Sequence, residues 1–423
     1  MQKYPTKCIR IYDMGLFCSF AQRLAEDFGR VEYFSPWAKE FPRERDKRIG
    51  KGLPGVHRIF DFWDGLDEVD RIWFPDVHCG DIAVHLRDIF EKLPQVYSAK
   101  ILSSFYGENY ELFRDWSKKQ FKKMGLPIGP YEVVKGTDAL RKFIKDHPGW
   151  FVKMDITRGD CESFDGLTLP LINDRLVQLE SDLGGIRNNV EFICEEPIKA
   201  EAEGGYDGIC IGGQFPATCL CGHEYKDKSY FGVVTKYDKL PERIRNINDK
   251  LAPHLKKVGY QNFFSTEERD GKLIDLCTRL GDPPNGSYQV NIENVSELIY
   301  EGADGKLVEP EWKHKFVGQV FMFSPWADLG KWQAISFPEK YAQYIRLRKA
   351  TRIEGQYYVI PTGEHNGVLG SIAYPGDDRG KIKETIKEIA DSVKGHGIEI
   401  RCEDLDKAEE GLLKLMADMK DEN

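Results

Sequence analysis

The first hundred residues alternate between apolar, strand-like runs and one-sided helical runs, and this alternation restricts the fold more than any other feature. Residues 7–13 (KCIRIYD) and 30–37 (RVEYFSPW) have strand patterns, and residues 19–29 between them have the spacing of an amphipathic helix that ends at a glycine. Two more apolar runs and a helical run follow between residues 58 and 93. Strands separated by helices predict a parallel, Rossmann-like sheet, whose ligands lie beyond the carboxyl ends of its strands.

Length and composition indicate a globular protein of several lobes. A chain of 423 residues is too long for one compact core, and 41% hydrophobic content with 12% aromatics excludes wholesale disorder. The net charge of -9, with acids and bases interleaved, argues against a general nucleic-acid binder. No run of about 18 apolar residues occurs, and the N-terminus lacks the apolar segment of a signal peptide. We therefore expect a cytoplasmic protein with reduced cysteines and no membrane partner.

Residues 262–277 (NFFSTEERDGKLIDLC) predict a hairpin that carries acids on both strands. A two-residue Asp-Gly turn would leave Glu267 on the face opposite Asp275. A three-residue loop, with the glycine in the left-handed region, would instead align Glu267, Asp275 and Cys277 on one face. We favour this second register, because two carboxylates on one face form a site for a hard cation such as Mg²⁺. The alternative is a surface row of salt bridges that includes Arg279.

Several local motifs resemble those of the ATP-grasp superfamily, specifically the glycinamide ribonucleotide synthetase-like branch. The most specific is LIDLCTRLGDPP (273–284), which is similar to the family pattern lEfNxRfGDPE. Four weaker matches precede it along the chain: SKKQFKKMGLPIGPY (117–131), WFVKMD (150–155), FICEEPI (192–198) and KAEAEGGYDG (199–208).

The resemblance implies a binding site for ATP. It places Lys118 and Lys153 on the phosphates, and Glu195 and Glu196 at the adenine and ribose. The residue type at 153 supports this independently, because an unpaired ammonium in an apolar strand is costly and an anionic ligand would compensate it. A solvated basic face is the alternative for Lys118, which has lysine neighbours. A further nucleotide contact is expected from either Glu201 or Glu203.

The resemblance also implies a catalytic group and a metal site. Glu267 and Asp275 would hold Mg²⁺, with Mn²⁺ as a possible substitute. Water, Asp282 or another acid such as Glu203 would complete the set of ligands. Arg279 would bind the transferring phosphoryl group, and Arg158 and Lys226 are expected to contact phosphate or substrate, since guanidinium groups bind phosphate in a bidentate manner.

Three departures from the family pattern are visible. Cys277 stands where the family has a metal-ligating asparagine, and a thiol is a poor ligand for Mg²⁺. The glycine-rich loop is reduced to ITRGDCESFDG (156–166), where Arg158 is expected to replace backbone amides over the phosphates. The first strand ends on YDMGLFCSF (12–20), whose bulky residues do not form a phosphate cradle. The family's phosphorylated substrate is therefore not carried over to this chain.

The sequence thus predicts an α/β protein with the ATP-grasp fold. The expected parts are a Rossmann-like domain (1–105), an ATP-grasp domain of two lobes with the ATP cleft between them (106–300), and a C-terminal α+β domain (301–423). The expected function is an ATP-dependent ligase that joins small-molecule carboxylate and amine substrates through an acyl-phosphate, with a homodimer as a family-level expectation. Two alternatives remain: a non-catalytic ATP-binding sensor or scaffold, and an ATP-grasp phosphotransferase.

Overall fold

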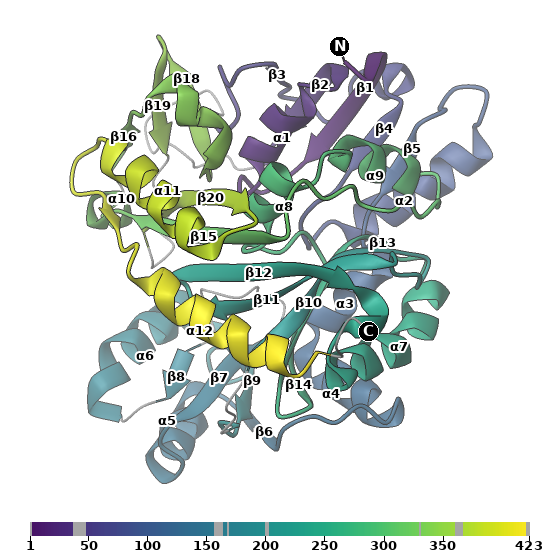
Figure 1. Ribbon diagram of the computed structural model, residues 1–423. Helices are drawn as coiled ribbons and strands as arrows, with labels where there is room; N and C mark the ends of the chain where they lie inside the picture. The colour runs from purple at the N-terminus through teal and green to yellow at the C-terminus, as the bar shows by residue number, and fades with distance from the viewer. Residues whose placement is uncertain are drawn as a thin grey trace.

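The computed structural model describes residues 2–36, 48–155, 164–166, 169–198, 203–329, 331–359 and 367–419. Within these ranges the chain forms four β-sheets with helices packed on them (Figure 1). This mixed α/β architecture confirms the predicted fold class.

The N-terminal part contains the predicted parallel sheet, with strand order β3-β2-β1-β4-β5. Its core is fully apolar, and the buried charges next to it are paired: the Arg10 Nε lies 2.6 Å from the Glu32 carboxylate, and both side chains are at most 2% exposed. The elements are β1 (Tyr4–Tyr12), α1 (Cys18–Leu24), β2 (Phe28–Phe34), β3 (Val56–Arg58), β4 (Arg71–Trp73), α2 (Gly80–Lys92) and β5 (Lys100–Leu102).

Residues 110–125 (YELFRDWSKKQFKKMG), whose pattern is helical, form two helices and not one. The run 110–125 forms α3 (Asn109–Leu112) and α4 (Arg114–Lys123), because Phe113 between them has a non-helical backbone (φ -100°, ψ 77°). The break makes Arg114 the first residue of α4, and the backbone N–H of Arg114 donates to the carboxylate of Asp155 at 2.8 Å.

A small antiparallel sheet with strand order β6-β9-β7-β8 follows. The helix α5 covers it with Leu140, Phe143 and Ile144, whose three- and four-residue spacing places them on one buried face. The elements are β6 (Tyr131–Lys135), α5 (Thr137–Asp146), β7 (Trp150–Met154), β8 (Phe164–Gly166), α6 (Leu169–Leu183) and β9 (Glu191–Glu195).

The largest sheet has the strand order β14-β13-β10-β11-β12-β15-β20-β17, with β21 paired to β15. It continues past residue 300, because β12 pairs with β15; the domain boundaries given above stay predictions. In Figure 1 the helix α12 crosses β11 and β12, and it also contacts β10. The strands are β10 (Glu203–Ile211), β11 (Thr218–Tyr225), β12 (Ser229–Lys236), β13 (Gln261–Arg269), β14 (Lys272–Cys277), β15 (Phe316–Phe323), β17 (Ile345–Leu347), β20 (Val368–Gly376) and β21 (Glu399–Ile400).

The helices around this sheet have apolar faces of the expected spacing. In α7, for example, Ile244, Ile247, Leu251 and Leu255 are fully buried. A three-stranded sheet, β16-β19-β18, lies beside the large one. The remaining elements are α7 (Glu242–Lys257), α8 (Asn285–Asn291), α9 (Val295–Gly302), α10 (Pro325–Asp328), β16 (Gln333–Ile335), β18 (Ala350–Ile353), β19 (Gln356–Val359), α11 (Arg379–Ser392) and α12 (Asp404–Ala417).

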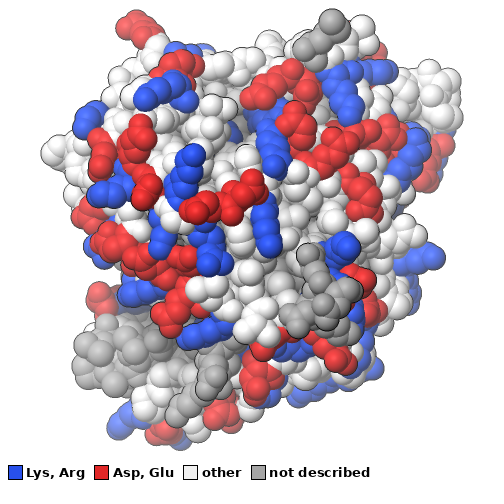
Figure 2. Space-filling view, in the orientation of Figure 1, with Lys and Arg blue, Asp and Glu red and all other residues white. Residues whose placement is uncertain are grey.

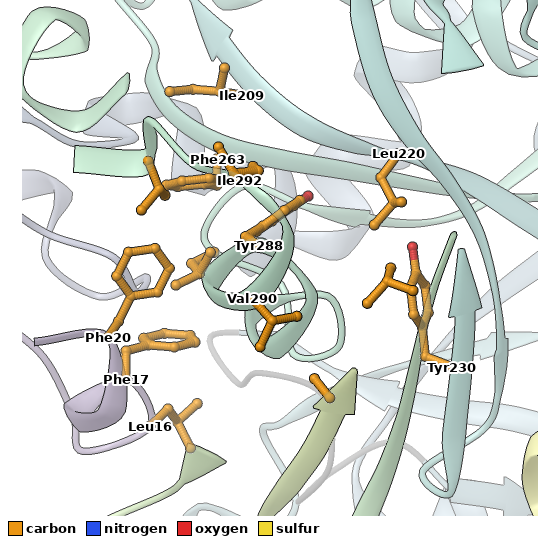
Figure 3. Close-up of a cluster of buried hydrophobic side chains, with 14 of the residues drawn as sticks. Leu16, Phe17, Phe20, Ile209, Leu220, Tyr230, Phe263, Tyr288, Val290 and Ile292 are labelled. Atoms are coloured by element: carbon orange, nitrogen blue, oxygen red, sulfur yellow. The ribbon is translucent and has the colours of Figure 1, made fainter. Parts of the chain in front are cut away.

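The N-terminal sheet and the large sheet share one hydrophobic core. Figure 3 shows Phe17 and Phe20 of the N-terminal part facing Tyr288 and Val290 of α8. The ring of Phe263, from β13, stacks on Tyr288 with centroids 5.1 Å apart. The two sheets are therefore joined by one closely packed core.

The surface in view carries positive and negative side chains side by side (Figure 2). This agrees with the interleaved charges of the sequence. Among the described helices, none is long and apolar enough to cross a membrane.

Candidate active site

A cleft lies over one face of the large sheet, and several acids line it. Strand pairing puts Gly205 opposite Glu267 and Asp207 opposite Ser265, so their side-chain positions share one face. Asp275 lies opposite Glu267 on the same face. The cleft is lined by these strands and also by Glu111, Arg114, Glu224, Lys226, Arg279, Asp282 and Arg348.

The hairpin reaches the predicted alignment by a different register. Asp270 and Gly271 form a two-residue turn, both with positive φ (50° and 71°), and Arg269 pairs with Lys272; the favoured three-residue loop is wrong. A β-bulge then skips Ile274, because Glu268 pairs with Leu273 and Glu267 with Asp275. The extra residue reverses the facing of everything beyond it, so Glu267 and Asp275 still share a face.

The two carboxylates of the hairpin have opposite electrostatic environments. Burial raises the pKa of Glu267 to about 8, and the carboxylates of Glu224, Asp275 and Glu203 add to this increase while Lys226 opposes it. Burial also acts on Asp275, but the positive charges of Lys153, Arg114 and Lys226 outweigh it and lower the pKa of Asp275. Without another cation, Glu267 therefore holds a proton near neutral pH while Asp275 is ionised.

These residues fit a Mg²⁺ ion that is also bound by a triphosphate. A divalent cation would supply the positive charge that the Glu267 carboxylate lacks, and both ligands are hard oxygen donors. In the described part of the chain, no three His, Cys, Asp or Glu side chains come together as a metal cluster. Mg²⁺ commonly binds one or two carboxylates and takes its other ligands from phosphates and water, so two protein ligands suffice.

Two predicted lysines meet at one glutamate beside this pair. The Nζ atoms of Lys118 and Lys153 lie 3.1 and 3.5 Å from the same Glu195 oxygen. The Lys153 Nζ also donates at 3.2 Å to the carbonyl of Ile274, the residue that the bulge leaves unpaired. Burial alone would raise the pKa of Glu195, but the charges of the two lysines outweigh it and lower this pKa. Burial lowers the pKa of Lys118. Two cations thus share one anion, which leaves an excess positive charge next to Asp275.

Arg114 lies between the lysines and the acids, and no motif in the sequence points to it. Its guanidinium lies 3.5 Å from the Asp275 carboxylate, and it lines both this cleft and the adjoining cavity that Lys118 and Glu195 line. The side chain is 8% exposed, and within the described residues its Nε has no hydrogen-bond partner. Its position depends on the break between α3 and α4, which helical periodicity does not reveal.

Arg279 lies in the cleft but is held by acids from other segments. Its Nε is 3.0 Å from Glu111 and 3.7 Å from Asp76. Glu111 also accepts hydrogen bonds from the backbone and hydroxyl of Thr278, at 2.7 and 3.2 Å. The guanidinium is therefore oriented by α3 and by the loop after β4.

The remaining predicted residues have less central positions. Lys226 lines the cleft with its Nζ 3.8 Å from Glu224, and the Glu203 carboxylate accepts a 2.5 Å hydrogen bond from Arg269. Asp282 lines the cleft and pairs with Arg348 at 2.7 Å. Glu196 is exposed at the end of β9. Arg158 and Glu201 lie outside the described residues.

Cys277 points to the same face as Asp275, at the position of the family's asparagine. Burial raises the pKa of the Cys277 thiol, and the thiol remains protonated at neutral pH. A protonated thiol does not ligate Mg²⁺, so this position adds nothing to a metal site.

No protein-family model matches the sequence, and no similar sequence is found among curated proteins. Solved structures, by contrast, match over nearly the whole chain. The phosphoribosylamine–glycine ligase of Thermotoga maritima aligns with a TM-score of 0.64 and 17% identity, covering 93% of this chain and 99% of its own. The biotin carboxylase domain of Hydrogenobacter thermophilus 2-oxoglutarate carboxylase was solved with MgADP. It aligns with a TM-score of 0.61 and 10% identity, covering 94% of this chain and 92% of its own.

A third similar structure is the L-amino acid ligase of Bacillus licheniformis, with a TM-score of 0.56 and 13% identity over 93% of this chain and 99% of that one. All three are ATP-grasp enzymes, and the ligase of T. maritima is the enzyme of the predicted branch. At these identities the likeness concerns the fold, and it extends from the N-terminal sheet to the C-terminal helices. The chain has the ATP-grasp fold.

Proposed function

We propose that the protein is an ATP-dependent ligase that joins a carboxylate to an amine and releases ADP and phosphate. One observation carries this proposal: Asp275 lines both the cleft that contains Glu267 and an adjoining cavity lined by Lys118 and Glu195. Lys153 joins this second group through its ion pair with Glu195. Cation-binding oxygens beside excess lysine charge are the two features that a metal-bound triphosphate requires.

In this proposal the chain acts by positioning and by charge. Lys118 and Lys153 bind phosphate oxygens in place of part of their contact with Glu195, and Glu267 and Asp275 are the residues that would hold Mg²⁺. When bound, the ion would neutralise triphosphate charge. Arg279, fixed by Glu111, orients the transferring phosphoryl group. No enzyme nucleophile is needed.

The reaction has two transfers. A substrate carboxylate oxygen attacks the γ-phosphorus, and the bond to the ADP oxygen breaks, giving an acyl-phosphate and ADP. An amine nitrogen then attacks the acyl carbon, the carbon–oxygen bond to phosphate breaks, and inorganic phosphate leaves with that electron pair. The amine loses a proton in this second step.

The test is a screen of the twenty amino acids and small carboxylates for ADP formation with ATP and Mg²⁺. Amino acids come first because the names of two similar structures, the phosphoribosylamine–glycine ligase and the L-amino acid ligase, contain them. The proposal expects ADP release that needs a carboxylate, and an amide product that needs an amine. Asp275→Asn should abolish both while leaving the fold intact, and Glu132→Gln, an exposed change on β6, is the control.

Other outcomes contradict the proposal in distinct ways. Nucleotide binding with no ADP formation from any carboxylate would favour a sensor or scaffold, for which Cys277 is the motivating departure. A stable phosphorylated product that no amine consumes would favour a phosphotransferase.

A further inference from the structure

A buried acid lies on the floor of the cleft and has no role in the scheme above. Asp207, on β10, is 7% exposed and lines the cleft. Its Oδ2 accepts a 2.6 Å hydrogen bond from the hydroxyl of Tyr230. It lies two residues along β10 from Gly205, which is opposite Glu267, a distance of roughly 7 Å along the strand. A substrate held near the metal position is therefore within reach of this carboxylate.

The contact between Tyr230 and Asp207 depends on a glycine between them. Tyr230 is on β12 and Asp207 on β10, so the phenol crosses over β11. It crosses at Gly222, where an added Cβ would be 2.0 Å from the Tyr230 oxygen. Any other residue at 222 would push the phenol away from the acid. The sheet is thus locally shaped to hold one oxygen of Asp207 and leave the carboxylate in the cleft.

No positive side chain in the described structure pairs with Asp207. The polar and titratable groups that face it are Ser265 from β13, Cys219 and Cys221 from β11, Tyr230 from β12 and Tyr288 from α8. Burial raises its pKa to about 6, and the hydrogen bond from Tyr230 and the nearby Ser265 hydroxyl limit the increase. The carboxylate is therefore ionised at neutral pH without a counter-ion, and a cation in the cleft would compensate it.

We propose that Asp207, held by Tyr230, binds the ammonium group of the amine substrate and accepts its proton. This inference rests on the proposed ligase function and extends it, because it defines the second substrate as an amine that arrives protonated. The N–H bond breaks, the proton moves to the Asp207 carboxylate, and the nitrogen lone pair attacks the acyl carbon. The proton leaves to solvent after phosphate departs. A general base works best when its pKa lies close to the pH at which the enzyme operates.

The experiment compares two nucleophiles with one acyl-phosphate. Each amino acid that supports ADP formation is incubated with ATP, Mg²⁺ and either an amino acid amine or hydroxylamine. Hydroxylamine is already uncharged at neutral pH and traps acyl-phosphates as hydroxamates without transferring an ammonium proton. Asp207→Asn is expected to lose amide formation by at least about 100-fold, the lower range for general-base catalysis, and to keep hydroxamate formation within a few-fold.

A second variant separates a base from a structural residue. Wild-type amide formation should fall as pH drops through about 6, where Asp207 becomes protonated. Tyr230→Phe removes a hydrogen bond that stabilises the ionised acid, so this fall should move to higher pH. A purely structural role for Tyr230 would lower the rate without moving the profile.

The results distinguish this inference from the proposed function. If the wild type forms no hydroxamate from any carboxylate, the ligase function fails and the inference with it. If the wild type forms hydroxamate but Asp207→Asn makes amide at the normal rate, the inference alone is wrong. Equal loss of hydroxamate and amide in a folded Asp207→Asn protein also overturns it, because the acid would then act before the amine step.

Discussion

Replacing Glu267 with glutamine should stabilise the protein in the absence of metal and abolish its stabilisation by Mg²⁺. In the folded state the pKa of Glu267 rises from 4.5 to about 8, so the folded protein holds the Glu267 proton more tightly than the unfolded chain does. The contribution of Glu267 to the free energy of unfolding is therefore fully present below about pH 4.5 and is lost as the pH rises to about 8. At 1.36 kcal/mol per pKa unit, the loss is at most about 5 kcal/mol.

The assay is urea unfolding with EDTA at pH 5 and pH 8. The wild type is expected to lose up to ~4 kcal/mol more of its unfolding free energy than Glu267→Gln over these three pH units, because glutamine stays neutral at both values. Asp275 does not contribute to the difference, since its lowered pKa confines its effect to acid pH. Glu132→Gln, on the exposed face of β6, is the matched control and should follow the wild type.

Added Mg²⁺ gives the second half of the prediction. It should raise wild-type stability at pH 8 more than at pH 5, because the ion competes with the proton for Glu267. The variant should show no such increase. If the free energies of unfolding of the wild type and Glu267→Gln change with pH in parallel, Glu267 is not an acid that stays protonated in the absence of a cation, and the prediction is wrong.

Three further predictions concern other parts of the structure. Lys153→Met should weaken binding of an ATP analogue by roughly 10- to 100-fold, the value of a hydrogen bond to a charged group, and an unchanged Kd in calorimetry would contradict the phosphate assignment. Gly222→Ala should cost about 1–3 kcal/mol in chemical unfolding, because its Cβ would displace the Tyr230 hydroxyl. Arg10→Met should cost about 1.5–3 kcal/mol, because the buried Glu32 then keeps only its pair with Arg30; a loss below 1 kcal/mol would be inconsistent with a buried pair.

The sequence was sufficient for the elements of the fold whose periodicity is strong. The parallel N-terminal sheet, the helix α7 and the acid-bearing hairpin all follow from the spacing of apolar residues and from the Asp270-Gly271 turn. The hairpin register was mispredicted because a single extra residue, Ile274, is invisible to a rule of strict alternation. The bulge leaves the Ile274 carbonyl free to accept a hydrogen bond from Lys153, which belongs to a different sheet. The contact that accompanies the bulge is therefore not visible in the sequence of the hairpin.

The site was less predictable than the fold, because it also depends on contacts between segments that are distant in sequence. Motif matching singled out Lys118, Lys153 and Glu195, and the structure brings these three together. Arg114 and Tyr230 had no signal, because each reaches the cleft from an element distant in sequence. Such contacts depend on how the sheets are placed, which local spacing does not determine.

The position of α12 has a consequence for how the protein is made. Leu415 of this helix packs against Gly204 and its Gly411 against His223, on the side of the large sheet that faces away from the acids. During synthesis, β10 and β11 therefore leave the ribosome some two hundred residues before the helix that covers their back. The nascent sheet exposes that surface until residues 404–417 emerge, and surface exposed in this way is prone to aggregation.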